Sequence, residues 1–175
     1  MKRALFLSII CLLLLPAPLL AQSRQRTTSR RSTQRTRSDT SQKTADARTD
    51  GANRVADQIK ILTRFLYLLG GVSKGIEAAD AAARRNEVSP AVLQQTEKSK
   101  ATVKTSLQNV REGLDKLEID FRTTPELQRY YISLAGVAAG AANAEDQANA
   151  GRYDQAGRSL LDVVNRLTDV LLAMR

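Results

Sequence analysis

VKTSLQNVREGLDKLEIDF, residues 103–121, is the stretch that decides the fold class of this chain. Its apolar residues recur at spacings of 4, 3, 4, 3 and 4, at Val103, Leu107, Val110, Leu114, Leu117 and Phe121. This spacing is typical of a helix that buries one seam against a neighbour. Upstream, Ser89 is a good helix cap, and Pro90 suits the first turn because its missing N–H is not needed there. The stretch therefore predicts a helix that begins near Pro90.

Three further segments carry helical periodicity, and no strand-like alternation persists. They are expected at about 52–85, 124–151 and 153–174. The first has a seam at Val55, Ile59, Leu62, Leu66 and Leu69. Gly70-Gly71 predicts a kink or break in it, because each glycine costs a helix about 1 kcal/mol relative to alanine. Thr124-Pro125 repeats the cap-and-proline start. Short connections predict an all-α, antiparallel up-down-up-down four-helix bundle over residues 51–175.

The turn before the last helix has a local resemblance to a known motif. Residues 150–156, AGRYDQA, resemble the turn between the two helices of a tetratricopeptide repeat. No repeat of that family's period occurs elsewhere in the chain. We therefore interpret the string as a generic tight helix hairpin.

The first helix carries a second apolar stripe beside its seam, at Ile61, Phe65, Leu68 and Val72. A helix that is apolar over so much of its circumference is central in a bundle or contacts something else apolar. Core packing is the favoured interpretation, since the other segments supply matching seams. The alternatives are a protein partner, self-association through this helix, and a membrane surface on which the helix lies.

Charged residues of the expected helices stand four apart on their outer faces. The pairs are Arg111 with Asp115, Glu112 with Lys116, Glu118 with Arg122, and Asp162 with Arg166. Such pairs stabilise a helix by about 0.2–0.5 kcal/mol each. We interpret them as a solvated helix surface and not as a site.

The N-terminus has the order of a secretory signal peptide. Lys2 and Arg3 precede the apolar run 5–15, and two prolines and the small residues of 21–23 follow it. Residues 1–22 are thus expected to direct the chain to the periplasm or the exterior. The many arginines just beyond the run favour an alternative, because positive charge tends to stay on the cytoplasmic side. In that alternative the segment is an uncleaved membrane anchor and the C-terminal domain is cytoplasmic.

Residues 23–50 are rich in arginine, serine and threonine and contain no aromatic residue, Leu, Ile or Val. Such a segment cannot bury enough apolar surface to offset the entropy of ordering, so we expect a disordered tail. Its arginines are the candidate anion-contacting residues, namely Arg24, Arg26, Arg30, Arg31, Arg35 and Arg37. The expected partner is an anionic envelope polymer or lipid surface. Nucleic acid is disfavoured, because no aromatic side chain is present to stack on bases. A solvated spacer is the alternative role.

The composition excludes many kinds of catalysis. The chain has no His and a single Cys, which is Cys11 within the apolar run. The carboxylate-histidine di-iron site of some four-helix bundles, covalent haem and structural zinc all lack their ligands. Without His, a serine or threonine nucleophile would need a lysine or carboxylate base, and no such pair is well placed. We expect no cofactor, no metal and no enzymatic activity, and we predict a binding or scaffolding protein.

Overall fold

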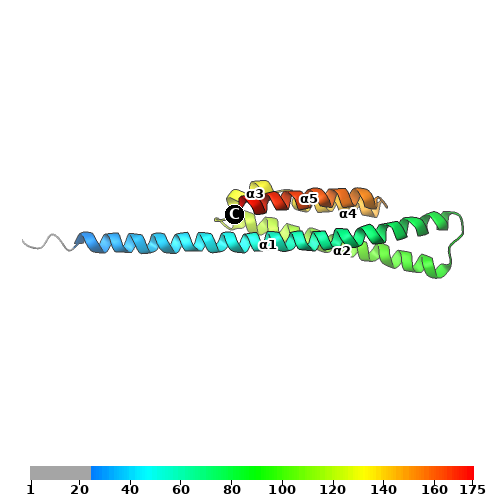
Figure 1. Cartoon of the computed structure of the whole chain (residues 1–175), viewed down its shortest axis with the longest axis horizontal. Helices are drawn as coiled ribbons and strands as arrows, with labels where there is room; N and C mark the ends of the chain where they lie inside the picture. The colour runs from blue at the N-terminus through cyan, green and yellow to red at the C-terminus, as the bar shows by residue number, and fades with distance from the viewer. Residues whose placement is uncertain (1–24) are drawn as a thin grey trace, which may run out of the picture. The chain divides into compact units, whose positions relative to one another are not determined.

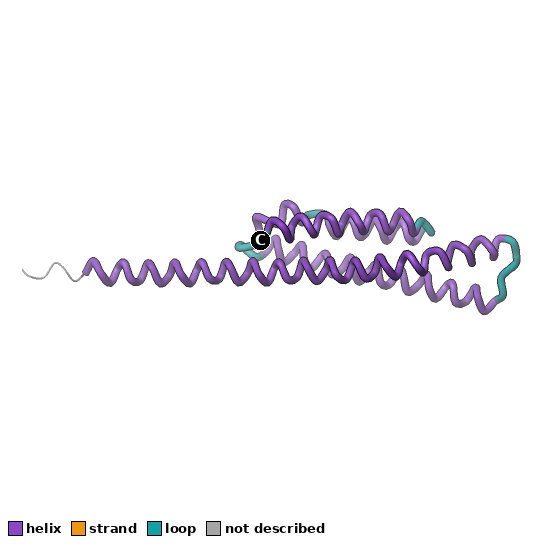
Figure 2. The backbone as a smooth tube through the Cα atoms, in the orientation of Figure 1, coloured by secondary structure: helices purple, strands orange, loops and turns teal. Residues whose placement is uncertain are grey.

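The structure, a computed structural model, describes residues 25–175, and every regular element in that range is an α-helix (Figure 1, Figure 2). The helices are α1 (Gln25–Arg84), α2 (Pro90–Thr123), α3 (Gln128–Leu134), α4 (Val137–Asn149) and α5 (Tyr153–Ala173). The predicted all-helical fold class is therefore confirmed for the described part of the chain. The expected signal peptide, residues 1–22, and Cys11 lie outside it.

Residues 41–175 form one packed unit. In this unit α4 packs against α2 and α5, and α3 contacts the same two helices. Helix α1 adds a line of buried side chains to the common core, at Val55, Leu62, Leu69 and Ile76. Helices α1 and α2 continue past the α4–α5 turn to their own connection at residues 85–89 (Figure 1). Their excess length thus extends beyond the shorter pair, α4 and α5.

Helix α1 begins at Gln25 and not near Ala52, so residues 25–50 are helical where the sequence predicted a disordered tail. Part of the reason is tertiary contact, which composition does not reveal. The ammonium of Lys43 lies 3.2 Å from the Glu126 carboxylate. Extending a helix that is already anchored costs less than nucleating a new one, which favours helix in the preceding residues as well.

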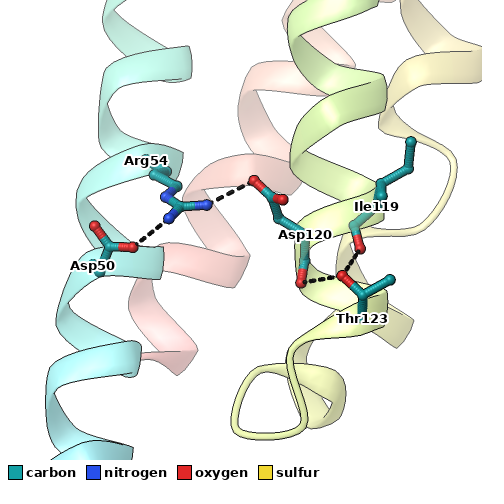
Figure 3. A network of polar contacts seen from close by, with 5 residues as sticks. All are labelled: Asp50, Arg54, Ile119, Asp120 and Thr123. Carbon is teal, nitrogen blue, oxygen red and sulfur yellow. Dashed lines mark hydrogen bonds and ion pairs between the residues drawn. The ribbon is translucent and has the colours of Figure 1, made fainter.

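A further polar contact of α1 reaches α2 itself (Figure 3). The Arg54 guanidinium donates to Asp50 on its own helix and to Asp120 on α2, each at 2.6 Å. One turn beyond Asp120, the Thr123 hydroxyl donates to the carbonyl of Ile119 at 2.8 Å and so stays within α2. Arg54 is therefore the side chain that links the two helices at this level.

The glycines of α1 do not interrupt it. Gly70, Gly71 and Gly75 all lie within the continuous helix, so the expected break does not occur. Leu69 and Ile76, on either side of the glycine pair, are both buried in the core. Burial of these two side chains holds the adjoining turns in place and offsets the low helix propensity of glycine.

The punctuation and seam predicted for α2 are both confirmed. The Ser89 hydroxyl accepts a hydrogen bond from the backbone N–H of Val92 at 3.4 Å, and Pro90 lies in the first turn. The buried residues include the whole predicted seam, namely Val103, Leu107, Val110, Leu114, Leu117 and Phe121. Opposite Gln58 of α1 the surface of α2 is Gly113, where an added Cβ would lie 3.1 Å from the Gln58 amide oxygen. The glycine therefore permits the two helices to approach closely.

The segment expected as a third single helix is two helices, α3 and α4. Gly136 separates them in a left-handed conformation with φ of 92°. L-residues rarely adopt this φ, whereas glycine has no Cβ to clash. Thr124 and Pro125 lie in a turn ahead of α3 rather than at its cap. The predicted short hairpin turn before α5 is confirmed at residues 150–152.

Two charged side chains from other helices hold this break. The Glu118 carboxylate of α2 accepts from the backbone N–H of Gly136 at 3.0 Å and of Ala138 at 2.9 Å. It thereby caps the N-terminus of α4, where an anion is stabilised by the unpaired amides and the helix dipole. From α5, Arg166 donates to the carbonyl of Ala135 at 3.0 Å. Glu118 and Arg166 are structural residues here, although spacing had predicted surface pairs for both.

We predict that Glu118→Ala lowers the free energy of unfolding by about 1–2 kcal/mol, because two amides at the start of α4 lose their acceptor. Glu112→Ala is the matched control, since Glu112 lies exposed on the same helix. It should change stability by less than about 0.5 kcal/mol. Urea unfolding followed by circular dichroism measures both. Equal losses in the two variants would contradict the capping role.

Candidate binding groove between the first two helices

The apolar stripe predicted on the first helix lies at the surface of α1. Ile61 is 50% exposed, Leu68 56% and Val72 37%, whereas Phe65 is partly buried against the core. The four residues are spaced so that they share one face of the helix. Of these four, only Phe65 belongs to the core, so core packing accounts for one residue of the stripe.

The stripe is exposed because α1 has more apolar surface than its neighbours cover. The helix turns a different line, Val55, Leu62, Leu69 and Ile76, into the common core. Ile59 and Leu66 lie along one side of that line and are partly buried. The stripe lies along the other side of the line.

Beside the stripe is an open groove of about 260 Å³ between α1 and α2. Its α1 wall is apolar and is made by Phe65, Leu68, Leu69 and Val72. The wall from α2 is mainly polar and is made by Gln95, Lys98, Ser99, Thr102, Val103 and Ser106. Three members of the predicted stripe thus line the groove, while Ile61 does not.

The polar wall was not predicted from the sequence. Its residues recur at spacings of three and four from Gln95 to Ser106, which places them on one face of α2. That face adjoins the apolar seam of α2. Its place beside the seam is the sequence feature that could have identified it as a wall of the groove. Lys98 is the only charged residue among those that line the groove. The Thr102 hydroxyl already donates to the Lys98 carbonyl at 2.9 Å.

The candidate arginines lie apart from this groove in the sequence. Arg24 is outside the described residues, and the other five, Arg26, Arg30, Arg31, Arg35 and Arg37, lie in the first part of α1. This part precedes the packed unit, which begins at Ser41. The arginines and the groove are therefore two separate candidate features.

A polar cluster joins α1 and α2 near their connection. Lys100 of α2 donates to Asp80 of α1 at 2.8 Å and to Glu97 at 3.1 Å. The hydrogen bond to Asp80 is the main cause that raises the pKa of Lys100 above its ordinary value. Burial raises the pKa of the nearby Tyr153 hydroxyl, and the neighbouring carboxylates contribute in the same direction.

Both shifts predict a loss of stability at alkaline pH. A group whose pKa is raised by folding contributes fully below its unfolded pKa and loses that contribution as pH rises through the folded value. For Tyr153 and Lys100 the loss begins near the ordinary values of about 10 and 10.4. We therefore predict that Tyr153→Phe flattens the decline of unfolding free energy between about pH 9 and 11.

The control for this experiment is Tyr67→Phe, because the Tyr67 side chain is 83% exposed. Its alkaline stability profile should match that of the unmodified protein. Urea unfolding at a series of pH values measures all three proteins. A Tyr153→Phe profile as steep as the Tyr67→Phe profile would refute the role of Tyr153.

Among residues 40–175, whose side chains the structure describes, no three His, Cys, Asp or Glu side chains lie together in a way that could hold a metal ion. None of the described helices combines the length and the hydropathy needed to cross a bilayer. Comparison of the sequence with protein-family models and curated proteins, and with solved structures, found no match.

Proposed function

We propose that this is a non-catalytic binding or scaffolding protein that engages an apolar partner through the α1–α2 groove. The observation that carries the proposal is the exposure of Leu68 and Val72 beside an open groove with one apolar wall. Leaving such side chains in water forgoes their burial, worth about 25 cal/mol per Å² of apolar area. A binding function explains why these apolar side chains remain exposed.

We further propose where the protein works and how its helices run. Residues 1–22 act as a signal peptide, and the protein works in the periplasm or outside the cell. The order of apolar run, prolines and small residues supports this placement. The helices are arranged up-down-up-down, which the short turns at 85–89 and 150–152 favour.

The second part of the proposal concerns the arginines. The basic segment contacts an anionic component of the envelope and holds the bundle near it. Residues 22–50 carry eight basic and three acidic residues, so the positive charge of the chain is concentrated there. Attraction of this kind is screened over a Debye length of about 8 Å at physiological ionic strength. The segment thus supplies a salt-dependent attraction, and the groove supplies the partner-binding face.

We predict that replacing Arg24, Arg26, Arg30, Arg31, Arg35 and Arg37 together by Gln abolishes binding to phosphatidylglycerol vesicles. Each arginine near an anionic surface contributes roughly 1 kcal/mol. Replacing the same six residues by Lys is the matched control, because the charge is kept, and binding should persist. Vesicle co-sedimentation at low and high salt is the measurement.

Two features of this test keep it specific. Substitution is preferred to deletion of residues 22–50, because Lys43 and Asp50 take part in ion pairs of the packed unit. Phosphatidylcholine vesicles report any binding that does not depend on anionic charge. If the Gln protein bound phosphatidylglycerol at low salt as well as the unmodified protein did, the arginine segment would not be the contact.

A second candidate is a membrane-anchored or membrane-surface protein. The exposed stripe favours it, since Lys60 and Arg64 are also exposed on α1 and could meet lipid headgroups. An uncleaved N-terminus would supply the anchor. The intact mass of the protein from its native host separates the two candidates. A chain that begins at Gln22 or Arg24 supports secretion, whereas an intact N-terminus supports the anchor.

A further inference from the structure

We propose that the exposed edge of α1 binds a second copy of this chain, with the two α1 helices antiparallel. This inference rests on the proposed function, because it names a second copy as the partner that covers the exposed apolar stripe. Two properties of this edge of α1 carry it. They are the order of large and small residues along the edge and the position of its charges.

A regular line of exposed positions runs along α1, beside the groove, and we call it the outer seam. Its members are spaced four and three residues apart, which is the heptad spacing of a coiled coil. They are Asp57, Ile61, Arg64, Leu68, Gly71, Gly75, Ala78, Ala82 and Arg85. Eight of these nine residues are exposed, and Ala82 is partly exposed. The outer seam is therefore a helix face that no other part of the packed unit covers.

The outer seam is large at one end and small at the other. Ile61 and Leu68 belong to the first half, whereas the second half, from Gly71 to Ala82, holds only glycine and alanine. A Cβ added at Gly71 or Gly75 would meet nothing within 4 Å, so packing within the chain does not require glycine there. Glycine is a poor helix former, but it lets another backbone approach closely.

Antiparallel pairing about a two-fold axis near Gly71 matches the two halves of the outer seam. Ile61 of one copy then lies over Ala82 of the second copy. In the same way Leu68 lies over Gly75 of the second copy. Large side chains fill the space beside small ones, which is the condition for close packing. Because the axis repeats each contact, the outer seam is complementary to itself, as a two-fold dimer interface must be.

The charges of the outer seam favour the antiparallel over the parallel arrangement. In the antiparallel pair, Asp57 of each copy lies near Arg85 of the other. Within one chain both side chains have only local partners, Lys60 for Asp57 and Glu87 for Arg85, each at 3.0 Å. A parallel pair would instead place Asp57 against Asp57 and Arg64 against Arg64, and like charges repel.

The size of the outer seam predicts a dimer that dissociates on dilution. A standard stable interface uses about 20–30 residues from each partner, and the outer seam with its flanking residues supplies fewer. A lipid surface fits this face less well than a second copy does. The half from Gly71 to Ala82 offers little apolar area to bury in lipid, although its small residues suit the approach of a helix.

The experiment is sedimentation equilibrium of the full chain over a wide range of protein concentration. We expect a monomer–dimer equilibrium. Leu68→Gln should weaken the dimer severalfold, because a polar side chain replaces the apolar one that packs on Gly75. Ile132→Gln is the matched control and should leave the equilibrium unchanged, because the 84% exposed Ile132 belongs to α3. Both positions are exposed, so the variants are expected to fold.

A charge exchange tests whether the partner is a second copy. Asp57→Arg and Arg85→Asp should each weaken the dimer about tenfold, because each creates two like-charge pairs in the symmetric dimer. The two substitutions combined in one chain restore opposite charges at both ends, so most of the lost affinity should return. Recovery of this kind requires that the two residues meet across the interface.

Disulfide formation reports the orientation of the two copies. With Cys11 replaced by Ser, Gly71→Cys should form an intermolecular disulfide on oxidation, because position 71 lies near the two-fold axis. Ile61→Cys should not, since its counterpart in the antiparallel dimer lies about 30 Å away along the outer seam. A parallel dimer would form the disulfide at both positions.

Several results would overturn the proposal of a second copy. These are a monomer at every concentration, equal effects of Leu68→Gln and Ile132→Gln, no recovery in the combined charge variant, and a disulfide at position 61 as readily as at 71. A monomer that binds phosphatidylcholine vesicles, and loses this binding in Leu68→Gln, would assign the stripe to a membrane surface. A monomer would still expose the stripe, as the proposed function requires, so the two proposals fail separately.

Discussion

Burial of the α2 seam is the interaction on which the packed unit depends. The six seam side chains, from Val103 to Phe121 at spacings of three and four, lie in the common core, to which α1, α4 and α5 also contribute. A two-helix hairpin of α1 and α2 could not cover this seam on both sides. Helix α4 covers it from one direction, and α5 in turn packs on α4. The polar contacts, such as Arg54 with Asp120, join helices that apolar burial has already brought together.

The same arrangement explains why a groove remains open. Helix α1 has two apolar lines on adjoining faces, and the core takes the line through Leu62 and Leu69 but only Phe65 of the other. The stripe through Leu68 and Val72 lies beside a wall of α2 that is mainly polar. Polar side chains there cannot close over the stripe without losing hydration. The result is an amphipathic groove, which is the basis of the proposed binding function.

The sequence predicted the features that repeat along a helix and missed those that depend on one contact between helices. The α2 seam follows from spacing alone, and its Ser89 cap follows from the residue type that precedes Pro90. The break at Gly136 does not, because glycine also occurs within continuous helix at Gly70 and Gly71. What distinguishes Gly136 is the Glu118 carboxylate, eighteen residues away in the chain.

One wall of the groove was predicted from the sequence and the other was not, because only the first depends on spacing along a single helix. Spacing identified Phe65, Leu68 and Val72 as one apolar face of α1. It did not identify Lys98 and its neighbours as the opposite wall, because that depends on the register of α1 against α2. The start of α1 was missed because composition favoured disorder, whereas tertiary contacts such as Lys43–Glu126 arise only on folding.

The central claim is that the face of α1 at Leu68 is open to solvent in the isolated protein. The most direct measurement is the rate of thiol modification of Leu68→Cys, made with Cys11 replaced by Ser and compared with Tyr67→Cys. The exposed fractions of Leu68 and Tyr67 are 56% and 83%, so we expect similar rates in dilute solution, where the chain is monomeric. A thiol at position 68 that stays protected while the one at position 67 reacts would contradict the account.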